Sequence, residues 1–86
     1  MDKQVDSTYN IDFSGLKAPM ITVYKSPKDY PGVFVARIWD ALNGPTDTVI
    51  IKKNLDELQE DILQNTGMLF IPRNKKDDPV IVGAWV

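Results

Sequence analysis

The segment from Gly32 to Ile62 constrains the fold of this chain more than any other. It contains an apolar run, GVFVARIWD, then the turn sequence ALNGP, then a second apolar run that leads directly into NLDELQEDI. Two such runs joined by Asn-Gly-Pro predict strands connected by a tight turn. The last nine residues of this segment, NLDELQEDI, predict a short amphipathic helix. Strands that form a sheet with one helix packed on it make a small α+β domain.

Five segments predict strands because they are apolar and rich in β-branched residues. Val33–Asp40 carries apolar side chains on both faces, so we expect it to be a central strand. The pattern predicts an antiparallel sheet of about five strands, in the order βββαββ, with one short helix packed on one face. The expected strands are Met20–Lys25, Val33–Asp40, Thr46–Lys53, Met68–Pro72 and Pro79–Val86.

The helix has clear start and stop signals. Asn54 is a favourable N-cap, Glu57 can complete a capping-box-like start, and Asn65–Gly67 supplies the stop. The stripe expected to face the sheet consists of Leu55, Leu58 and Ile62, with Leu63 at its margin. Four carboxylates, here called the acidic helix face, occupy the opposite side: Asp56, Glu57, Glu60 and Asp61.

Residues 1–17 form an N-terminal segment, and residues 18–86 are expected to fold as a single α+β domain. Apolar and polar residues alternate between Val5 and Phe13, which favours a strand near Thr8–Phe13. The alternative is a mobile tail, since the ends of domains are often loose.

The composition argues against catalysis. The chain contains no cysteine and no histidine. It therefore has no disulfide, no thiolate nucleophile, no conventional ligands for structural zinc and no histidine to act as a general base. The pairs Asp77 with Asp78 and Asp40 with Asp47 lack the ligand density of a calcium loop. We expect no enzymatic activity, no cofactor and no metal site.

Charge and hydropathy narrow the range of partners. The formal net charge is −2 and the pI about 4.8, whereas nucleic-acid-binding domains usually have a pI above ~9. No apolar run approaches the ~20 residues needed to cross a bilayer, and the polar start shows no secretory signal. We therefore expect a cytoplasmic protein without membrane contact, and the charge argues against nucleic acid as a partner.

Three groups of residues are candidate partner-binding sites. The acidic helix face could dock a basic partner, or simply be a solvated surface. Arg37 and Trp39 share one face of a strand and could stack on a base or a peptide, or the arginine stem could merely cover a partly buried tryptophan. Trp85 lies next to the C-terminus and should pack in the domain's own core or against a second copy of the chain.

Two functions follow from these residues. The leading prediction is a small non-enzymatic protein-interaction module that binds through a sheet edge or the acidic helix face, with homodimerisation through the apolar strand VIVGAWV left open. The alternative is a nucleic-acid-associated regulator, which requires the sheet to bring the basic residues together. Those residues are Arg37, Lys52, Lys53, Arg73, Lys75 and Lys76.

Residues 29–62 resemble the antitoxin domain of HicB-type proteins. In that family strands separated by a glycine-containing turn precede a helix that opens on a Leu-Glu-Glu-like step, and YPGVFVARIWD, TDTVIIK and NLDELQEDI match that order. The loop ALNGPTD lacks the family's Pro-Gly-Cys segment, and the helix is shorter. The resemblance implies a partner-binding, non-catalytic domain. The whole chain also looks like small bacterial proteins for which no function is implied.

Overall fold

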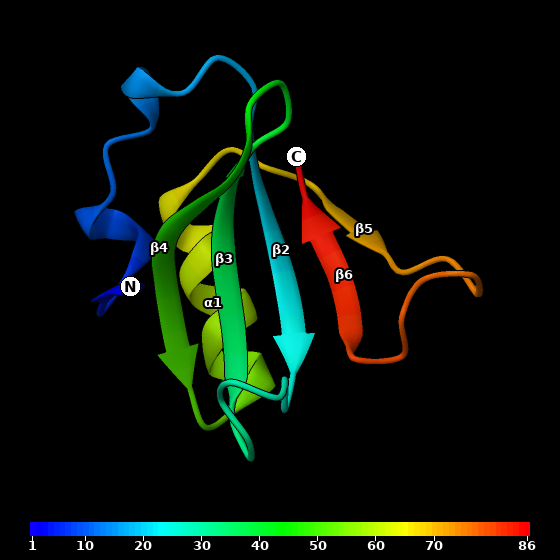
Figure 1. Cartoon of the computed structure of the whole chain (residues 1–86). Helices are drawn as coiled ribbons and strands as arrows, with labels where there is room; N and C mark the ends of the chain where they lie inside the picture. Colours follow the sequence, from blue (N-terminus) through cyan, green and yellow to red (C-terminus); the bar gives the residue numbers. More distant parts are fainter.

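The computed structural model describes residues 1–86 and shows a six-stranded sheet with one α-helix against it (Figure 1). The elements are β1 (Lys3–Val5), β2 (Pro19–Lys25), β3 (Phe34–Asp40), β4 (Gly44–Lys52), α1 (Leu55–Asn65), β5 (Phe70–Pro72) and β6 (Ile81–Trp85). Across the sheet the strand order is β1-β4-β3-β2-β6-β5. No helix in the structure has the length and apolar character needed to cross a bilayer.

The predicted α+β class is confirmed, but the sheet is mixed rather than wholly antiparallel. β1 is a sixth strand that runs parallel to β4, with Gln4 opposite Val49. All other neighbouring strands are antiparallel. The outer edge of β4 would otherwise leave backbone N–H and C=O groups unpaired, and β1 covers part of it.

The strand predicted at Thr8–Phe13 is wrong. Two short 3-10 turns lie there instead, η1 (Thr8–Asn10) and η2 (Phe13–Gly15). Each is capped by the polar residue before it; the Asp12 carboxylate, for example, accepts a hydrogen bond from the Ser14 N–H at 2.9 Å. Such local bonds compete with strand pairing, and the alternation of apolar and polar residues does not reveal them.

The predicted strands in the middle of the sheet are confirmed. β3 lies between β2 and β4, as its two apolar faces predicted. Gly44 follows the β3–β4 loop with a φ of +104°, a conformation that favours glycine. At the head of this loop Asp40 is buried, and hydrogen bonds from the Asn43 side chain and the Leu42 N–H hold its pKa below the usual range. Its carboxylate therefore orders the turn.

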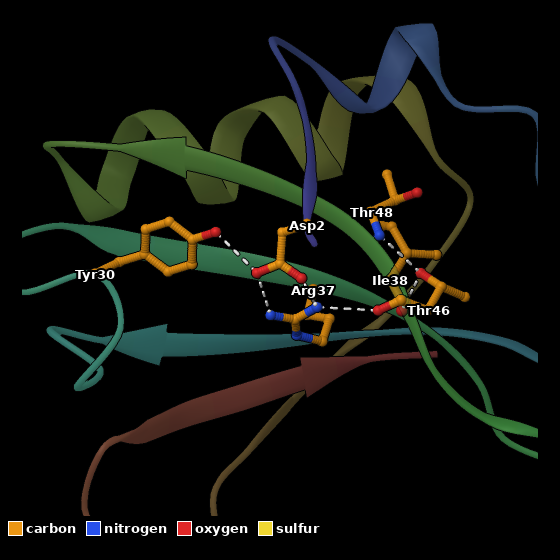
Figure 2. Close-up of polar contacts among 6 residues, drawn as sticks. All are labelled: Asp2, Tyr30, Arg37, Ile38, Thr46 and Thr48. Atoms are coloured by element: carbon orange, nitrogen blue, oxygen red, sulfur yellow. Dashed lines mark hydrogen bonds and ion pairs between the residues drawn. The ribbon is translucent and has the colours of Figure 1, made fainter.

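An irregularity in the β3–β4 ladder orients Arg37. The register shifts between Arg37 and Trp39, and the Thr46 side chain bonds to backbone groups on both strands at this irregularity (Figure 2). Its Oγ1 donates to the Ile38 carbonyl at 2.7 Å and accepts from the Thr48 N–H at 3.2 Å. The Thr46 carbonyl accepts from Arg37 Nη1 at 3.0 Å. The bulge thus holds the guanidinium on the face of the sheet that α1 does not cover.

The helix begins and ends as predicted. The Asn54 side chain accepts a hydrogen bond from the Glu57 N–H at 3.2 Å, and Thr66 is the C-cap residue. The predicted stripe faces the sheet, with Leu58 and Ile62 fully buried. The core cluster consists of Ile21, Val23, Ala36, Ile38, Ile50, Leu58, Ile62 and Trp85.

The helix covers only part of the sheet. Its backbone lies closest to β4 and β3 and does not extend over β5 and β6 in Figure 1, although Trp85 of β6 reaches Gln59 on the helix. β5 and β6 are also joined beyond the bounds of β5, because Leu69 and Val86 exchange backbone hydrogen bonds of 2.8 and 3.0 Å.

Candidate functional site

A groove of about 430 Å³ lies between one flank of α1 and the strands β5 and β6. Its helical residues are related by spacings of three and four, which places them on one side of the helix, while Phe70 and Trp85 are opposite one another on β5 and β6. The lining residues are Leu55, Asp56, Gln59, Glu60, Leu63, Phe70 and Trp85. The helix and the edge region of the sheet, which the sequence indicated as separate candidates, therefore meet in one place.

Aromatic side chains form the floor of the groove. Trp85 is only 5% exposed, and its indole Nε1–H donates to Gln59 Oε1 at 2.9 Å. The ring centroids of Trp85 and Phe70 are 5.3 Å apart, with the rings tilted by 53°. Of the two placements left open for Trp85, the structure shows the domain's own core.

The acidic helix face is not one continuous surface. Asp56 and Glu60 line the groove. Glu57 is directed elsewhere, and its carboxylate lies 3.8 Å from the Lys52 ammonium. Only two of the four carboxylates therefore belong to the groove, and they give it an acidic side.

Asp61, the fourth carboxylate, binds the N-terminal segment, so its assignment to a free acidic face is wrong. It accepts hydrogen bonds from the Thr8 N–H at 2.9 Å and from Thr8 Oγ1 at 2.6 Å. Burial raises the pKa of the Asp61 carboxyl, but hydrogen bonds from the Ser7 and Thr8 hydroxyls and the Thr8 N–H outweigh it, and the pKa is lowered. Asp61 thus anchors residues 7–8 to α1.

Exposed apolar side chains flank the β5 edge on both faces of the sheet. Leu63 lines the groove, whereas Leu69, Ile71 and Val86 alternate with Phe70 and Trp85 and therefore lie on the opposite face. The four residues concerned, with their exposed fractions, are Leu63 (57%), Leu69 (74%), Ile71 (51%) and Val86 (50%).

The backbone edge of β5 is a poor template for another strand. The N–H groups of Leu69 and Arg73 point inward to β6, and successive residues of a strand alternate in direction. The outward groups therefore belong to Phe70 and Pro72, and proline has no N–H to donate. A strand added at this edge would meet a short strand that offers the Phe70 N–H but no donor at Pro72.

Arg37 does not form a free stacking platform with Trp39. Its Nη1 and Nη2 contact the two Asp2 carboxylate oxygens at 2.8 and 2.9 Å, and the Tyr30 hydroxyl donates to the same carboxylate at 2.8 Å (Figure 2). These bonds from Arg37 and Tyr30 hold the pKa of Asp2 well below its usual range, and the bond to Asp2 raises the pKa of Tyr30. Trp39 is partly buried beside them, and its indole N–H has no acceptor.

Replacing Asp2 with asparagine should make the fold less sensitive to acid. The pKa of Asp2 is lower in the folded chain than its ordinary value of about 3.9. Its ion pair therefore stabilises the fold above about pH 4 and is lost as the pH falls through the folded-state pKa. Urea unfolding at neutral and strongly acidic pH should show a smaller loss for Asp2→Asn than for wild type. Asp6→Asn, at an exposed position, should behave like wild type; equal acid sensitivity in all three would contradict this role of Asp2.

The basic residues are dispersed. Lys52 ends β4 and Lys53 follows it, whereas Arg73–Lys76 follows β5. Three strands separate β4 from β5, a distance of roughly 19 Å at ~4.8 Å per strand. Arg37 is already paired with Asp2. The sheet does not bring these groups into one basic surface.

Sequence reasoning missed residues on both faces of the sheet. Gln59, Leu63 and Phe70 line the groove, but only the tertiary arrangement shows that this helix flank faces β5. Asp2 and Tyr30 were missed because they reach Arg37 from other parts of the chain. The one sequence feature that could have identified this flank of the helix is the spacing of Asp56, Glu60 and Leu63, which places them on one side of α1.

Comparisons with models of known protein families, with curated proteins and with solved structures give no match to this chain.

Proposed function

We propose that this chain is a small non-enzymatic protein-interaction module whose binding site is the groove between α1 and strands β5 and β6. The observation that supports this most is the joint placement of two acidic side chains, Asp56 and Glu60, beside an aromatic floor of Phe70 and Trp85. A groove that is apolar at its base and acidic along one side suits a partner with apolar and basic side chains together.

The inferred occupant is an amphipathic helix of another protein, with lysine or arginine beside its apolar stripe. The groove follows the flank of α1, and the helix does not extend over β5 and β6 (Figure 1). A helix docked there would continue the helical layer over these strands and cover the exposed Leu63. Strand addition is less favourable because β5 is short and Pro72 withholds a donor.

The nucleic-acid alternative receives no support from the arrangement of charges. A phosphate-binding surface needs several cations on one face. Here Lys52 and Arg73 lie at distant strands, and Arg37 is neutralised by Asp2.

Charge reversal in the groove should weaken binding of the selected partner. Helical peptides selected against wild type from a random amphipathic library should carry lysine or arginine within one turn of their apolar anchors. The double variant Asp56→Lys, Glu60→Lys should bind them at least about tenfold more weakly, or ~1.4 kcal/mol, because attraction becomes like-charge repulsion. Fluorescence anisotropy of the labelled peptides measures the change.

A matched control separates the groove from the total charge. Asp6→Lys with Asp47→Lys changes the net charge equally, at exposed positions near β1 and β4. This control should bind the peptides within about twofold of wild type, as expected for distant screened charges. Equal weakening by both pairs of substitutions, or selection of peptides without basic residues, would refute the proposed site.

A further inference from the structure

Arg37 and Tyr30 have the geometry of a receptor for one carboxylate. Two guanidinium nitrogens contact both oxygens of Asp2, and the tyrosine hydroxyl adds a third bond (Figure 2). The planar guanidinium fork matches a carboxylate in a way that a lysine could not. The further bond from Arg37 Nη1 to the Thr46 carbonyl at 3.0 Å does not involve Asp2. The Arg37 guanidinium therefore remains oriented by Thr46 when Asp2 leaves.

Asp2 is attached through a short strand at the edge of the sheet. Asp2 precedes β1, which has three residues and pairs only with β4 at the sheet edge. Short edge elements open at a small fraction of the global free energy of unfolding. Arg37, by contrast, lies in the central strand β3. The receptor is thus part of the rigid sheet, and its occupant belongs to a segment that can detach.

A small pocket adjoins the guanidinium and indicates what a ligand would carry beside its carboxylate. The pocket has a volume of about 200 Å³, below the roughly 300–1,000 Å³ of sites for drug-sized ligands, and therefore suits one side chain. Tyr24 and Val35 give it apolar walls, while Asp29 contributes a negative charge. That charge disfavours a second anionic group, so phosphates and other polyanions fit poorly.

We propose that Arg37, Tyr30 and this pocket form a second binding site, which takes an acidic side chain with an apolar neighbour from another polypeptide, and that Asp2 is its intramolecular competitor. In the closed state Asp2 occupies the fork. In the open state residues 1–2 move away, the ligand carboxylate binds Arg37 and Tyr30, and its apolar neighbour enters the pocket. This site lies on the opposite face of the sheet from the groove and does not depend on the groove's function.

Removing the competitor should strengthen binding of a minimal ligand. The probe is the peptide acetyl-Leu-Asp-amide, titrated into the full chain and followed by the NMR signals of the Arg37 side chain and of Tyr30. Asp2→Ala should bind it at least about tenfold more tightly than wild type, since one charge-assisted pair no longer has to be broken. Acetyl-Leu-Asn-amide should not bind measurably, and Asp2→Ala combined with Arg37→Gln should lose the gain. A folded Asp2→Ala variant that binds no better than wild type would overturn the proposal.

Wild type provides a test that does not rely on any variant folding. Saturation with acetyl-Leu-Asp-amide should displace Asp2 from the guanidinium, so the pKa of Asp2, followed by the chemical shift of its carboxyl carbon, should rise towards the ordinary aspartate value. An Asp2 pKa that does not change at peptide concentrations up to the solubility limit would also overturn the proposal.

Discussion

Replacing Trp85 with alanine should lower the free energy of unfolding by about 3–5 kcal/mol, the usual cost of truncating a buried large aromatic side chain. Trp85 is 5% exposed, packs against Phe70 and belongs to the core cluster. A chain of 86 residues has a total stability of only about 4–13 kcal/mol. The variant should therefore be largely unfolded or have a much lower urea midpoint, as measured by far-UV circular dichroism.

Trp85→Phe separates the contribution of the ring from that of the indole N–H. Phenylalanine retains the contact with Phe70 but loses the hydrogen bond to Gln59, so it should cost about 1–2 kcal/mol, clearly less than alanine. Wild-type stability in Trp85→Ala would show that Trp85 does not hold β6 to the core.

Replacing Gly83 with alanine should destabilise the fold by about 1–3 kcal/mol, as overpacking usually does. A Cβ at this position would lie 2.6 Å from the Ile71 carbonyl oxygen and 2.6 Å from the Phe70 ring. The ring could shift, but the carbonyl belongs to the backbone of the neighbouring strand. Thermal unfolding should show a lower midpoint, by roughly 4–8 °C per kcal/mol for a domain of this size.

Gly67→Ala is the matched control for Gly83→Ala. Apart from Gly67 itself and its two chain neighbours, no residue has an atom within 4 Å of a Cβ built there, and its φ is not left-handed. The substitution should be neutral or slightly stabilising, since alanine reduces the conformational freedom of the unfolded chain. If both alanine variants lost the same stability, crowding beneath Phe70 would not be the reason that glycine occupies position 83.

The sequence predicted those elements whose determinants are local. β3 and β4 could be predicted because two apolar runs flank an Asn-Gly-Pro turn, and α1 because Asn54 precedes a stripe of leucine and isoleucine. The N-terminal segment could not be predicted in this way. Its alternating pattern resembles a strand, but capping by Ser7 and Asp12 favours 3-10 turns.

The candidate sites were predictable only in part, because they depend on contacts between distant segments. The carboxylates of Asp56 and Glu60 were identified from helical spacing, but their position beside Phe70 depends on how far α1 extends across the sheet. Asp61 was misassigned because its partner Thr8 is 53 residues away. Arg37 and Asp2 are 35 residues apart, and no local pattern links them.

Mapping a selected peptide onto the chain by NMR tests the central claim most directly. Amide and side-chain signals are recorded for wild type while a selected basic amphipathic peptide is added. The proposed groove predicts the largest shifts at the Trp85 indole N–H, the Gln59 side chain, Leu63 and Phe70. Shifts concentrated around Arg37 and Trp39 on the opposite face, or at Lys3–Val5 of β1, would contradict a binding site between α1 and the β5–β6 edge.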